Sequence, residues 1–156
     1  MPWSADEIAS LRLESLRPLW DAFLDTMHAY WSESFPEDMS VPDWREAYER
    51  WLRRALGDGE RWLWLYRRGD EVLGLANFYV RPERALWGEI AEFYVAPPCR
   101  RQGLGRFLVG RIREALRAQG ITTIEVSVEL RLSSSVAFWR AMGFEPYRYL
   151  MLSDNV

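Results

Sequence analysis

The stretch Ala91–Gln119, AEFYVAPPCRRQGLGRFLVGRIREALRAQ, organises the rest of the chain. It opens with a short apolar run, passes through a loop that contains proline and glycine, and continues with an apolar residue at every fourth position from Leu104 to Leu116. The run is typical of a strand, and the four-residue spacing is typical of an amphipathic helix. Gly120 follows where a left-handed helix C-cap would lie. The stretch therefore predicts a strand, a short loop and a helix.

Two glycines, Gly103 and Gly105, stand where this helix begins. Glycine lets the backbone approach a ligand closely, and the first turn of a helix presents unpaired N–H groups and the positive end of its dipole. An anion is the natural ligand of such a loop, and a phosphate or pyrophosphate is the one we expect. We expect Arg100, Arg101 and Arg106 to contact it, and the arginines further along the helix to be solvated.

The loop differs from the common nucleotide-binding patterns. A dinucleotide loop reads G-x-G-x-x-G, and Leu108 stands where its third glycine would be. No Walker-type G-K-[ST] follows the glycines either. A nucleotide-binding protein that uses the same two glycines is therefore an alternative that the pattern disfavours.

Hydrophobic periodicity assigns the remaining elements. A short strand is expected at Glu7–Leu13, followed by a helix capped by Ser15. The other expected elements are a loop at 32–42, a helix at 44–57, strands at 61–67, 72–80, 89–95, 121–129 and 147–152, and a short helix capped by Ser133 or Ser134. Three consecutive strands before a helical crossover imply a mixed sheet, antiparallel in its early strands. The prediction is an α/β (α+β) fold in one domain, residues 1–156.

A second motif, SSSVAFWRAMGF, lies at 133–144. With the glycine loop it makes the chain resemble the GNAT-type N-acetyltransferase superfamily, whose acyl-CoA loop reads [RQ]-x-x-G-x-[GA] and whose C-terminal segment reads N-x-x-A-x-x-[LF]-Y-x-x-x-G-F. Two positions depart from the second pattern: Leu132 replaces its Asn, and Trp139 replaces its Tyr. The matching residues are Arg100, Gly103 and Gly105 in the loop, and Phe138, Gly143 and Phe144 in the segment.

The resemblance implies the GNAT fold and acetyl-CoA as cosubstrate, with direct attack by a primary amine in a ternary complex. The acceptor would be a small amine, an aminoglycoside-like molecule or a peptide N-terminus. The Leu132 and Trp139 departures keep open a non-catalytic acyl-CoA-binding module of the same fold. The cofactor-binding residues that we expect are Tyr94, Val95, Arg100, Arg101, Gln102, Gly103, Leu104, Gly105, Arg106, Ser134, Phe138 and Trp139.

Glu92 is the first candidate for the general base that acetyl transfer to an amine needs. It lies on the expected strand at 89–95, as bases of this family often do, and a buried carboxylate there would have a raised pKa. A surface glutamate without a catalytic role is an equal alternative, and Glu89, Glu125 and Glu129 are weaker candidates.

The resemblance also implies an oxyanion donor, and the residues offer candidates for the general acid. By resemblance, the backbone N–H of Tyr94 or Val95 would stabilise the oxyanion. The CoA thiolate leaves without much acid help, so loss of the family tyrosine is tolerable. Tyr94, Tyr147 or Tyr149 could each replace it, although the pattern favours an ordinary packed tyrosine at each of these positions.

The composition of the chain gives expectations for its cellular location and its partners. The chain has 156 residues with 49% hydrophobic residues, a single Cys99, and no apolar run that approaches the ~20 residues of a membrane span. We expect a cytoplasmic protein with no signal peptide, no membrane or nucleic-acid partner and no metal, and a homodimer by resemblance. Acids exceed arginines before Arg61, which suits either a cationic substrate or simple solvation.

Overall fold

The computed structural model describes residues 2–155, which form two compact units, one ending at Val126 and the other beginning at Ser127. The first unit holds one sheet with strand order β1-β2-β3-β4-β5, antiparallel from β1 to β4 and parallel between β4 and β5. The mixed sheet that the sequence predicted is confirmed, and the single domain over 1–156 stays a prediction. The elements of this unit are β1 (Ile8–Leu11), α1 (Arg17–Ser34), α2 (Trp44–Gly57), β2 (Arg61–Arg68), β3 (Glu71–Val80), β4 (Trp87–Val95), α3 (Leu104–Ala118) and β5 (Thr123–Val126).

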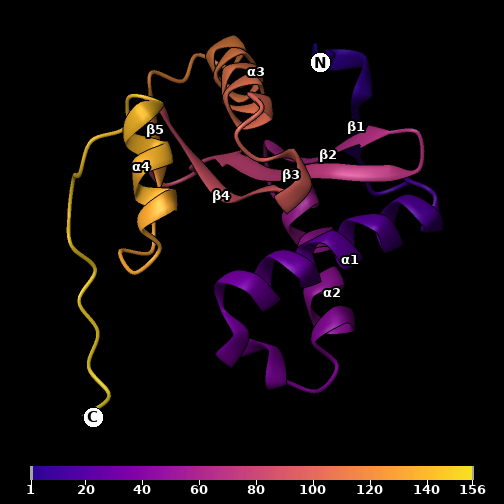
Figure 1. Ribbon diagram of the computed structural model, residues 1–156, viewed down its shortest axis with the longest axis horizontal. Coiled ribbons are helices and arrows are strands. Elements are labelled where there is room, and N and C mark those ends of the chain that lie inside the picture. The colour runs from indigo at the N-terminus through magenta and orange to yellow at the C-terminus, as the bar shows by residue number, and fades with distance from the viewer. Residues whose placement is uncertain (1, 156) are drawn as a thin grey trace. The chain divides into compact units, whose positions relative to one another are not determined.

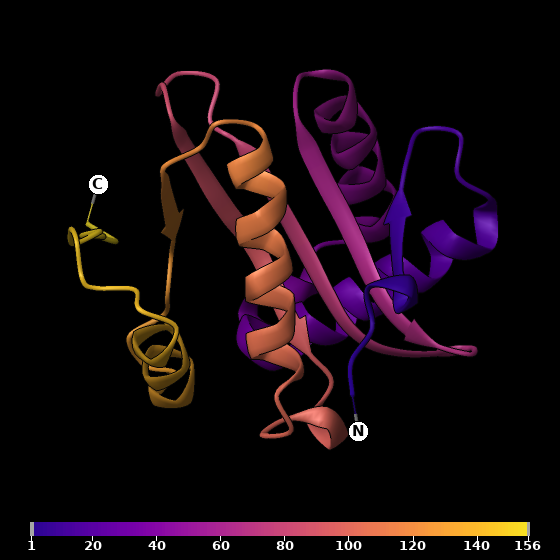
Figure 2. The ribbon, with the colours of Figure 1, turned by 90° about the horizontal axis from the view of Figure 1, so that it is seen from above.

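Helices cover both faces of the sheet in this unit (Figures 1 and 2). α1 and α2 lie against one face and α3 against the other. Strand side chains alternate between the two faces, so β2 and β3 contribute buried residues to the apolar clusters on both sides of the sheet. The cluster under α1 and α2 contains Leu11, Trp20, Phe23, Leu24, Met27, Leu52, Leu63, Leu65, Leu75 and Tyr94, and that under α3 contains Tyr66, Leu73, Leu104 and Leu108.

Two strand glycines let α3 approach the sheet closely. A Cβ on Gly74 would lie 3.1 Å from the carbonyl oxygen of Tyr94 and 3.3 Å from the Leu108 side chain. A Cβ on Gly88 would lie 3.1 Å from the Leu116 side chain. The apolar stripe of the helix therefore packs directly onto backbone, which fixes where its N-terminal end lies relative to β4.

β4 contains a β-bulge at Ala91. Ile90 pairs with Phe78 and Glu92 pairs with Asn77, so Ala91 is an extra residue on the β4 side. Pairing of β4 with β5 also ends at Ile90, opposite Val126. Beyond the bulge, β4 continues to Val95 in register with β3.

The second unit contains α4 (Ser133–Ala141). Its N-cap is Leu132, whose side chain makes no capping hydrogen bond, so the expected cap at Ser133 or Ser134 is wrong. Within this unit, the Trp139 ring lies edge-on to the rings of Phe138 and Phe144, at 5.0 and 5.1 Å between centroids.

The expected strand at 147–152 is wrong, because these residues are not in a strand. Their alternation satisfies the side-chain pattern, but a strand also requires a partner for its backbone, and the described residues after Ser127 contain no other strand. Tyr149, Leu150, Met151 and Leu152 are exposed. The expected strand at 121–129 is confirmed only for Thr123–Val126.

The expected cap at Ser15 is also wrong. α1 starts at Arg17 with Leu16 as N-cap and Pro18 in its first turn. The Ser15 hydroxyl instead accepts a hydrogen bond from the backbone N–H of Arg12, at 2.7 Å. Because it caps the preceding turn, it is not available to the helix.

Candidate functional site

Glu92 is buried and bound by donors from three different elements. The indole N–H of Trp31 (α1) donates to Glu92 Oε2 at 2.9 Å, and Asn77 Nδ2 (β3) donates to Oε1 at 3.0 Å. The hydroxyl of Tyr48 (α2) also donates to Oε1. Glu92 is 8% exposed, which excludes the reading as a surface glutamate.

Burial raises the pKa of Glu92, although its three hydrogen-bond donors and the positive charge of Arg61 oppose the rise. Desolvation disfavours the charged carboxylate, so the group holds a proton more readily than a solvated glutamate does. A raised pKa brings the carboxyl group nearer to the range in which a base works at neutral pH. Its role as the base stays a prediction.

Asn77 extends this network toward the surface. Its Oδ1 accepts from Arg61 Nη1 at 2.6 Å while its Nδ2 donates to Glu92, so it joins the cation to the carboxylate. Asn77 is fully buried. The sequence reasoning missed Asn77, Arg61, Tyr48 and Trp31 as partners of Glu92. The one available signal was Asn77 itself, a lone amide within the apolar strand VLGLANFYV.

The edge of β4 that points away from β3 carries the Val95 N–H. The N–H of Ala96 donates to Leu73 on the β3 side at 2.9 Å, and the carbonyl of Tyr94 also points toward β3, close to Gly74. Backbone groups of successive strand residues point to opposite edges. The N–H of Val95 therefore faces the other edge. Of the two expected oxyanion donors, Val95 has the suitable orientation and Tyr94 does not.

The loop after β4 carries two residues in the left-handed region, Arg101 at φ 65° and Gly103 at φ 89°. Gly103 is the N-cap of α3, and no side chain caps this helix end. The first hydrogen bond of the helix runs from the Phe107 N–H to the Gly103 carbonyl, at 3.0 Å. The N–H groups of the preceding residues therefore point out of the N-terminal end, where an anion would bind.

The Trp3 side chain is hydrogen-bonded to this loop. Its indole N–H donates to the carbonyl of Gln102 at 3.0 Å, and its ring packs edge-on to Tyr66, with 5.8 Å between centroids. In a trans peptide the N–H points opposite to the C=O, so this bond directs the Gly103 N–H away from Trp3. The segment is anchored further by the Ser4 N–H, which donates to the Tyr66 hydroxyl at 2.9 Å.

The three arginines of the loop differ in their surroundings. Arg100 donates from Nε to the Val95 carbonyl at 2.8 Å, and its two terminal nitrogens bind the Glu33 carboxylate at 2.6 and 2.9 Å. Its guanidinium is thus already paired in this structure, whereas Arg101 and Arg106 are exposed. Phosphate contact by these arginines stays a prediction.

Of the other expected site residues, Tyr94 and Leu104 lie in the first unit and three lie in the second. Tyr94 is 9% exposed, and burial, together with Glu33, raises the pKa of its hydroxyl while Arg100 opposes the rise. The side chain of Leu104 is buried, so only its backbone can face a ligand. Ser134, Phe138 and Trp139 lie on α4 in the second unit, and their contact with a cofactor stays a prediction.

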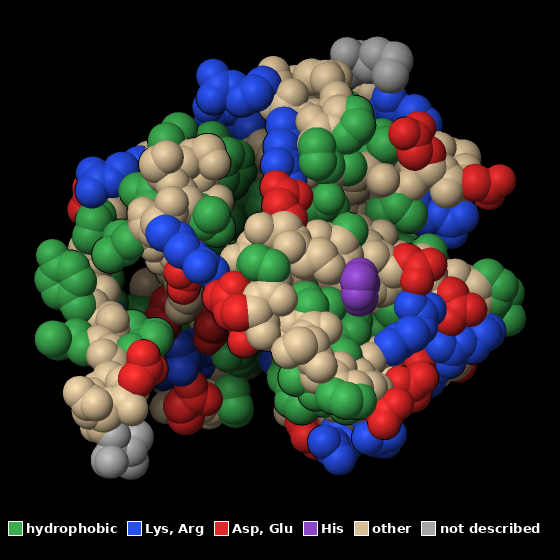
Figure 3. Space-filling view, turned by 60° about the horizontal axis from the view of Figure 1, so that its bottom comes forward, with side chains coloured by type: hydrophobic (Ala, Val, Ile, Leu, Met, Phe, Trp, Pro, Cys, Tyr) green, Lys and Arg blue, Asp and Glu red, His purple; other side chains and the backbone are tan. Residues whose placement is uncertain are grey.

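Acids on α1 and α2 are largely paired with arginines. Arg45 binds Asp21 and Asp25 at 3.0 and 2.6 Å, and Arg17 binds Asp21 and Glu49, each at 2.8 Å. Figure 3 shows acidic and basic side chains interspersed on this face, around the exposed His28. This pairing favours solvation over recognition of a cationic substrate.

Residues 2–155 contain neither a metal-binding cluster nor a membrane-spanning helix. No three His, Cys, Asp or Glu side chains in this part of the chain gather where they could hold a metal ion. No described helix is long and apolar enough to cross a membrane.

Residues 20–144 match the family model described as the acetyltransferase (GNAT) family. The chain belongs to this family. It is 33% identical over 94 residues to the mycothiol acetyltransferase of Beutenbergia cavernae, covering 57% of this chain and 32% of the relative. It is 28% identical over 78 residues to the IAA acetyltransferase of Azospirillum brasilense, covering 50% of each. The matches thus span a third to a half of the length of these relatives.

Solved structures of the GNAT fold resemble the chain along nearly its whole length. The aminoglycoside 6'-N-acetyltransferase AAC(6')-IG of Acinetobacter haemolyticus has a TM-score of 0.73 at 15% identity, covering 96% of this chain and 98% of the other. AAC(6')-Iy, solved with the bisubstrate analogue CoA-S-monomethyl-acetylneamine, has a TM-score of 0.69 at 14% identity, covering 96% and 97%. At such low identity the likeness establishes the GNAT fold, and the GNAT fold predicted from the two motifs is confirmed.

Proposed function

We propose that the chain transfers the acetyl group of acetyl-CoA to a primary amine. The observation that carries this proposal is the arrangement around the end of β4. An outward-facing Val95 N–H is followed within ten residues by an uncapped helix N-terminus, and the buried Glu92 carboxylate lies on the same strand. Membership of the acetyltransferase family supports the same reaction.

Each group has a distinct role in this reaction. The N–H groups of Gly103, Gly105 and their neighbours bind the pyrophosphate of acetyl-CoA at the positive end of α3. The Val95 N–H donates to the thioester oxygen as it acquires negative charge. Glu92 accepts a proton from the amine, directly or through water.

The reaction needs no reagent other than the amine, acetyl-CoA and water. The neutral amine attacks the thioester carbon, a C–N bond forms, and the C–S bond breaks when the tetrahedral intermediate collapses. The proton lost by the amine goes to Glu92, and CoA leaves as a thiolate that takes a proton from solvent. Trp139, whose indole N–H does not release its proton usefully, has no acid role here.

The acceptor is a primary amine whose identity the residues leave open. Relatives and neighbours are named for mycothiol, for IAA and for aminoglycosides, and one neighbour was solved with sisomicin. A screen should therefore include aminoglycosides, amino sugars and peptide N-termini, with release of free CoA thiol as the readout.

Binding of acetyl-CoA tests the first part of the proposal by calorimetric titration. Gly105→Glu places a negative charge at the helix N-terminus and should abolish binding. Gly110→Glu is the matched control, because Gly110 is exposed on the same helix and its added Cβ meets no atom within 4 Å. The assignment of the loop is wrong if both variants bind acetyl-CoA as the unmodified chain does.

A non-catalytic acyl-CoA-binding module is the second candidate, because Leu132 and Trp139 replace the Asn and Tyr expected there. The two functions differ in one result. A module binds acetyl-CoA and releases no thiol with any amine, whereas an enzyme releases thiol in proportion to the acetylated amine.

A further inference from the structure

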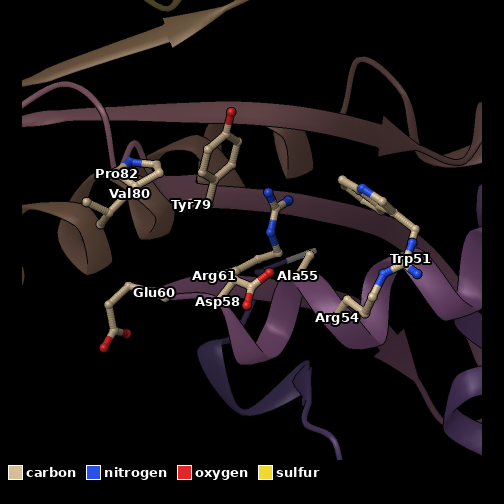
Figure 4. A pocket seen from close by; sticks show the side chains of 10 residues that line it. Trp51, Arg54, Ala55, Asp58, Glu60, Arg61, Tyr79, Val80 and Pro82 are labelled. Atoms are coloured by element: carbon tan, nitrogen blue, oxygen red, sulfur yellow. The ribbon is translucent and has the colours of Figure 1, made fainter.

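A pocket with a volume of about 220 Å³ opens where α2 ends, β2 begins and β3 ends. Figure 4 shows the Arg61 side chain rising in the middle of it, with Tyr79 on one side and Trp51 on the other. Ala55, Val80 and Pro82 complete its apolar walls. None of the residues predicted to bind acetyl-CoA lines this pocket.

Arg61 is held between two aromatic rings. Its guanidinium carbon lies 4.1 Å from the ring centre of Tyr79 and 5.2 Å from that of Trp51. A guanidinium held between ring faces keeps its planar edge free for a ligand, and that edge matches the two oxygens of a carboxylate. The position of the side chain is therefore fixed before any ligand arrives.

Most of the hydrogen-bonding capacity of this guanidinium is unused. It has five N–H donors, and among residues 2–155 its one hydrogen-bond acceptor is Asn77 Oδ1, at 2.6 Å. In the same part of the chain, no carboxylate lies within 4.0 Å of it. Burial lowers the pKa of Arg61, as expected for a cation that lacks a direct counter-ion.

The acids that line the pocket do not supply this counter-ion. Asp58 and Glu60 are exposed, and Glu60 points away from Arg61 (Figure 4). A partly buried charge is stabilised most by a partner that also makes hydrogen bonds to it. A ligand carboxylate on the free edge of Arg61 would provide both.

We propose that this pocket binds a small carboxylate ligand, with the acid group on Arg61 and an apolar body against Ala55, Val80 and Pro82. The proposal is independent of acetyl transfer, because it uses none of the residues assigned to acetyl-CoA. Asn77 nevertheless connects the pocket to Glu92 through two hydrogen bonds.

Calorimetric titration of the full chain with benzoate tests the proposal, with benzamide as a neutral analogue of the same shape and inorganic phosphate as a different anion. We expect saturable binding of benzoate, and binding of benzamide weaker by roughly tenfold or more, because a charge-assisted hydrogen bond is lost. Equal binding of benzamide, tighter binding of phosphate, or no saturable binding of benzoate would each overturn the proposal.

Two variants locate the site. Arg61→Gln removes the charge and shortens the side chain, so the contact with Asn77 is lost together with the carboxylate-binding edge, and it should weaken benzoate binding by roughly tenfold or more. Arg54→Gln removes an exposed cation from the same rim and should change it by less than about threefold. Equal effects of the two variants, or none, would contradict the assignment. If Arg61→Gln does not fold, the comparison of benzoate with benzamide on the unmodified chain decides the matter.

Discussion

Replacing Glu92 by Gln tests the assignment of the general base. The amide keeps the size of the side chain, and its Oε1 can still accept from the Trp31 N–H. Its Nε2 can donate to the Tyr48 hydroxyl, which is able to turn and accept. The same Nε2 would face the Asn77 Nδ2, also a donor, and Asn77 cannot turn round without losing its bond to Arg61. The variant therefore loses one hydrogen bond, which costs about 1 kcal/mol of the free energy of unfolding.

The effect of this substitution on turnover should be much larger than its effect on stability. A positioned base contributes roughly 10²- to 10⁴-fold, so kcat should fall by that factor while KM for acetyl-CoA stays within about twofold. The kcat of the unmodified enzyme should fall as the pH drops through the raised pKa of Glu92, because the protonated carboxyl group cannot accept a proton. This acidic limb should be absent from the variant.

Stability gives an independent readout of the same pKa shift. A carboxyl group with a raised pKa in the folded state contributes stability that is fully present below its unfolded value, 4.5, and is lost as the pH rises through the folded value. We expect Glu92→Gln to remove that loss, so its free energy of unfolding relative to the unmodified chain should improve as the pH rises over this range. Chemical denaturation at several pH values measures it.

Glu89→Gln is the matched control for these experiments. Glu89 lies on the same strand and accepts from the Tyr79 hydroxyl at 2.5 Å, and it faces Arg81 at 3.3 Å. If Glu92→Gln keeps more than about a tenth of kcat with its acidic limb intact, our assignment of the base is wrong. A larger loss in Glu89→Gln would transfer the role to that residue.

Three further substitutions test the scaffold of the site. Gly74→Val would press a side chain to 3.1 Å from the Tyr94 carbonyl and should lower the free energy of unfolding by about 1–3 kcal/mol, whereas Gly110→Ala, in open space on the helix, should raise it by up to about 1 kcal/mol. Thermal unfolding distinguishes the two, and equal effects would refute the packing argument. Trp3→Phe removes the hydrogen bond to the Gln102 carbonyl but keeps a ring, and should weaken acetyl-CoA binding about two- to tenfold with kcat unchanged. Unaltered affinity in a titration would mean that this contact does not orient the loop.

What the sequence predicted well depends on local pattern. The α3 helix and its glycine loop are specified by residues that are neighbours in the chain, so spacing alone located them. The same holds for α2, whose predicted range 44–57 agrees with the structure. Glu92 was selected because strand parity and resemblance both pointed to it.

What could not be predicted depends on residues far apart in the chain. Tyr48 and Trp31 reach Glu92 from positions 44 and 61 residues away, and no spacing rule links them. The expected strand at 147–152 is wrong for the same reason, because its side chains fit a strand while the described residues from Ser127 onward contain no other strand to pair with. The predicted cap at Ser15 is wrong for a more local reason. The backbone N–H of Arg12 in the preceding turn already donates to the Ser15 hydroxyl, which therefore does not cap α1.

The bulge at Ala91 has a consequence for how this protein can change over evolution. Glu92 and the residues after it keep their register with β3 beyond the bulge, so a β4 without the extra residue could still pair along β3. Yet the bulge lies between the part of β4 that pairs on both sides and the part that carries Glu92 and the outward Val95 amide. We therefore expect a lineage released from selection for the proposed reaction to be able to lose Ala91 while it keeps the sheet.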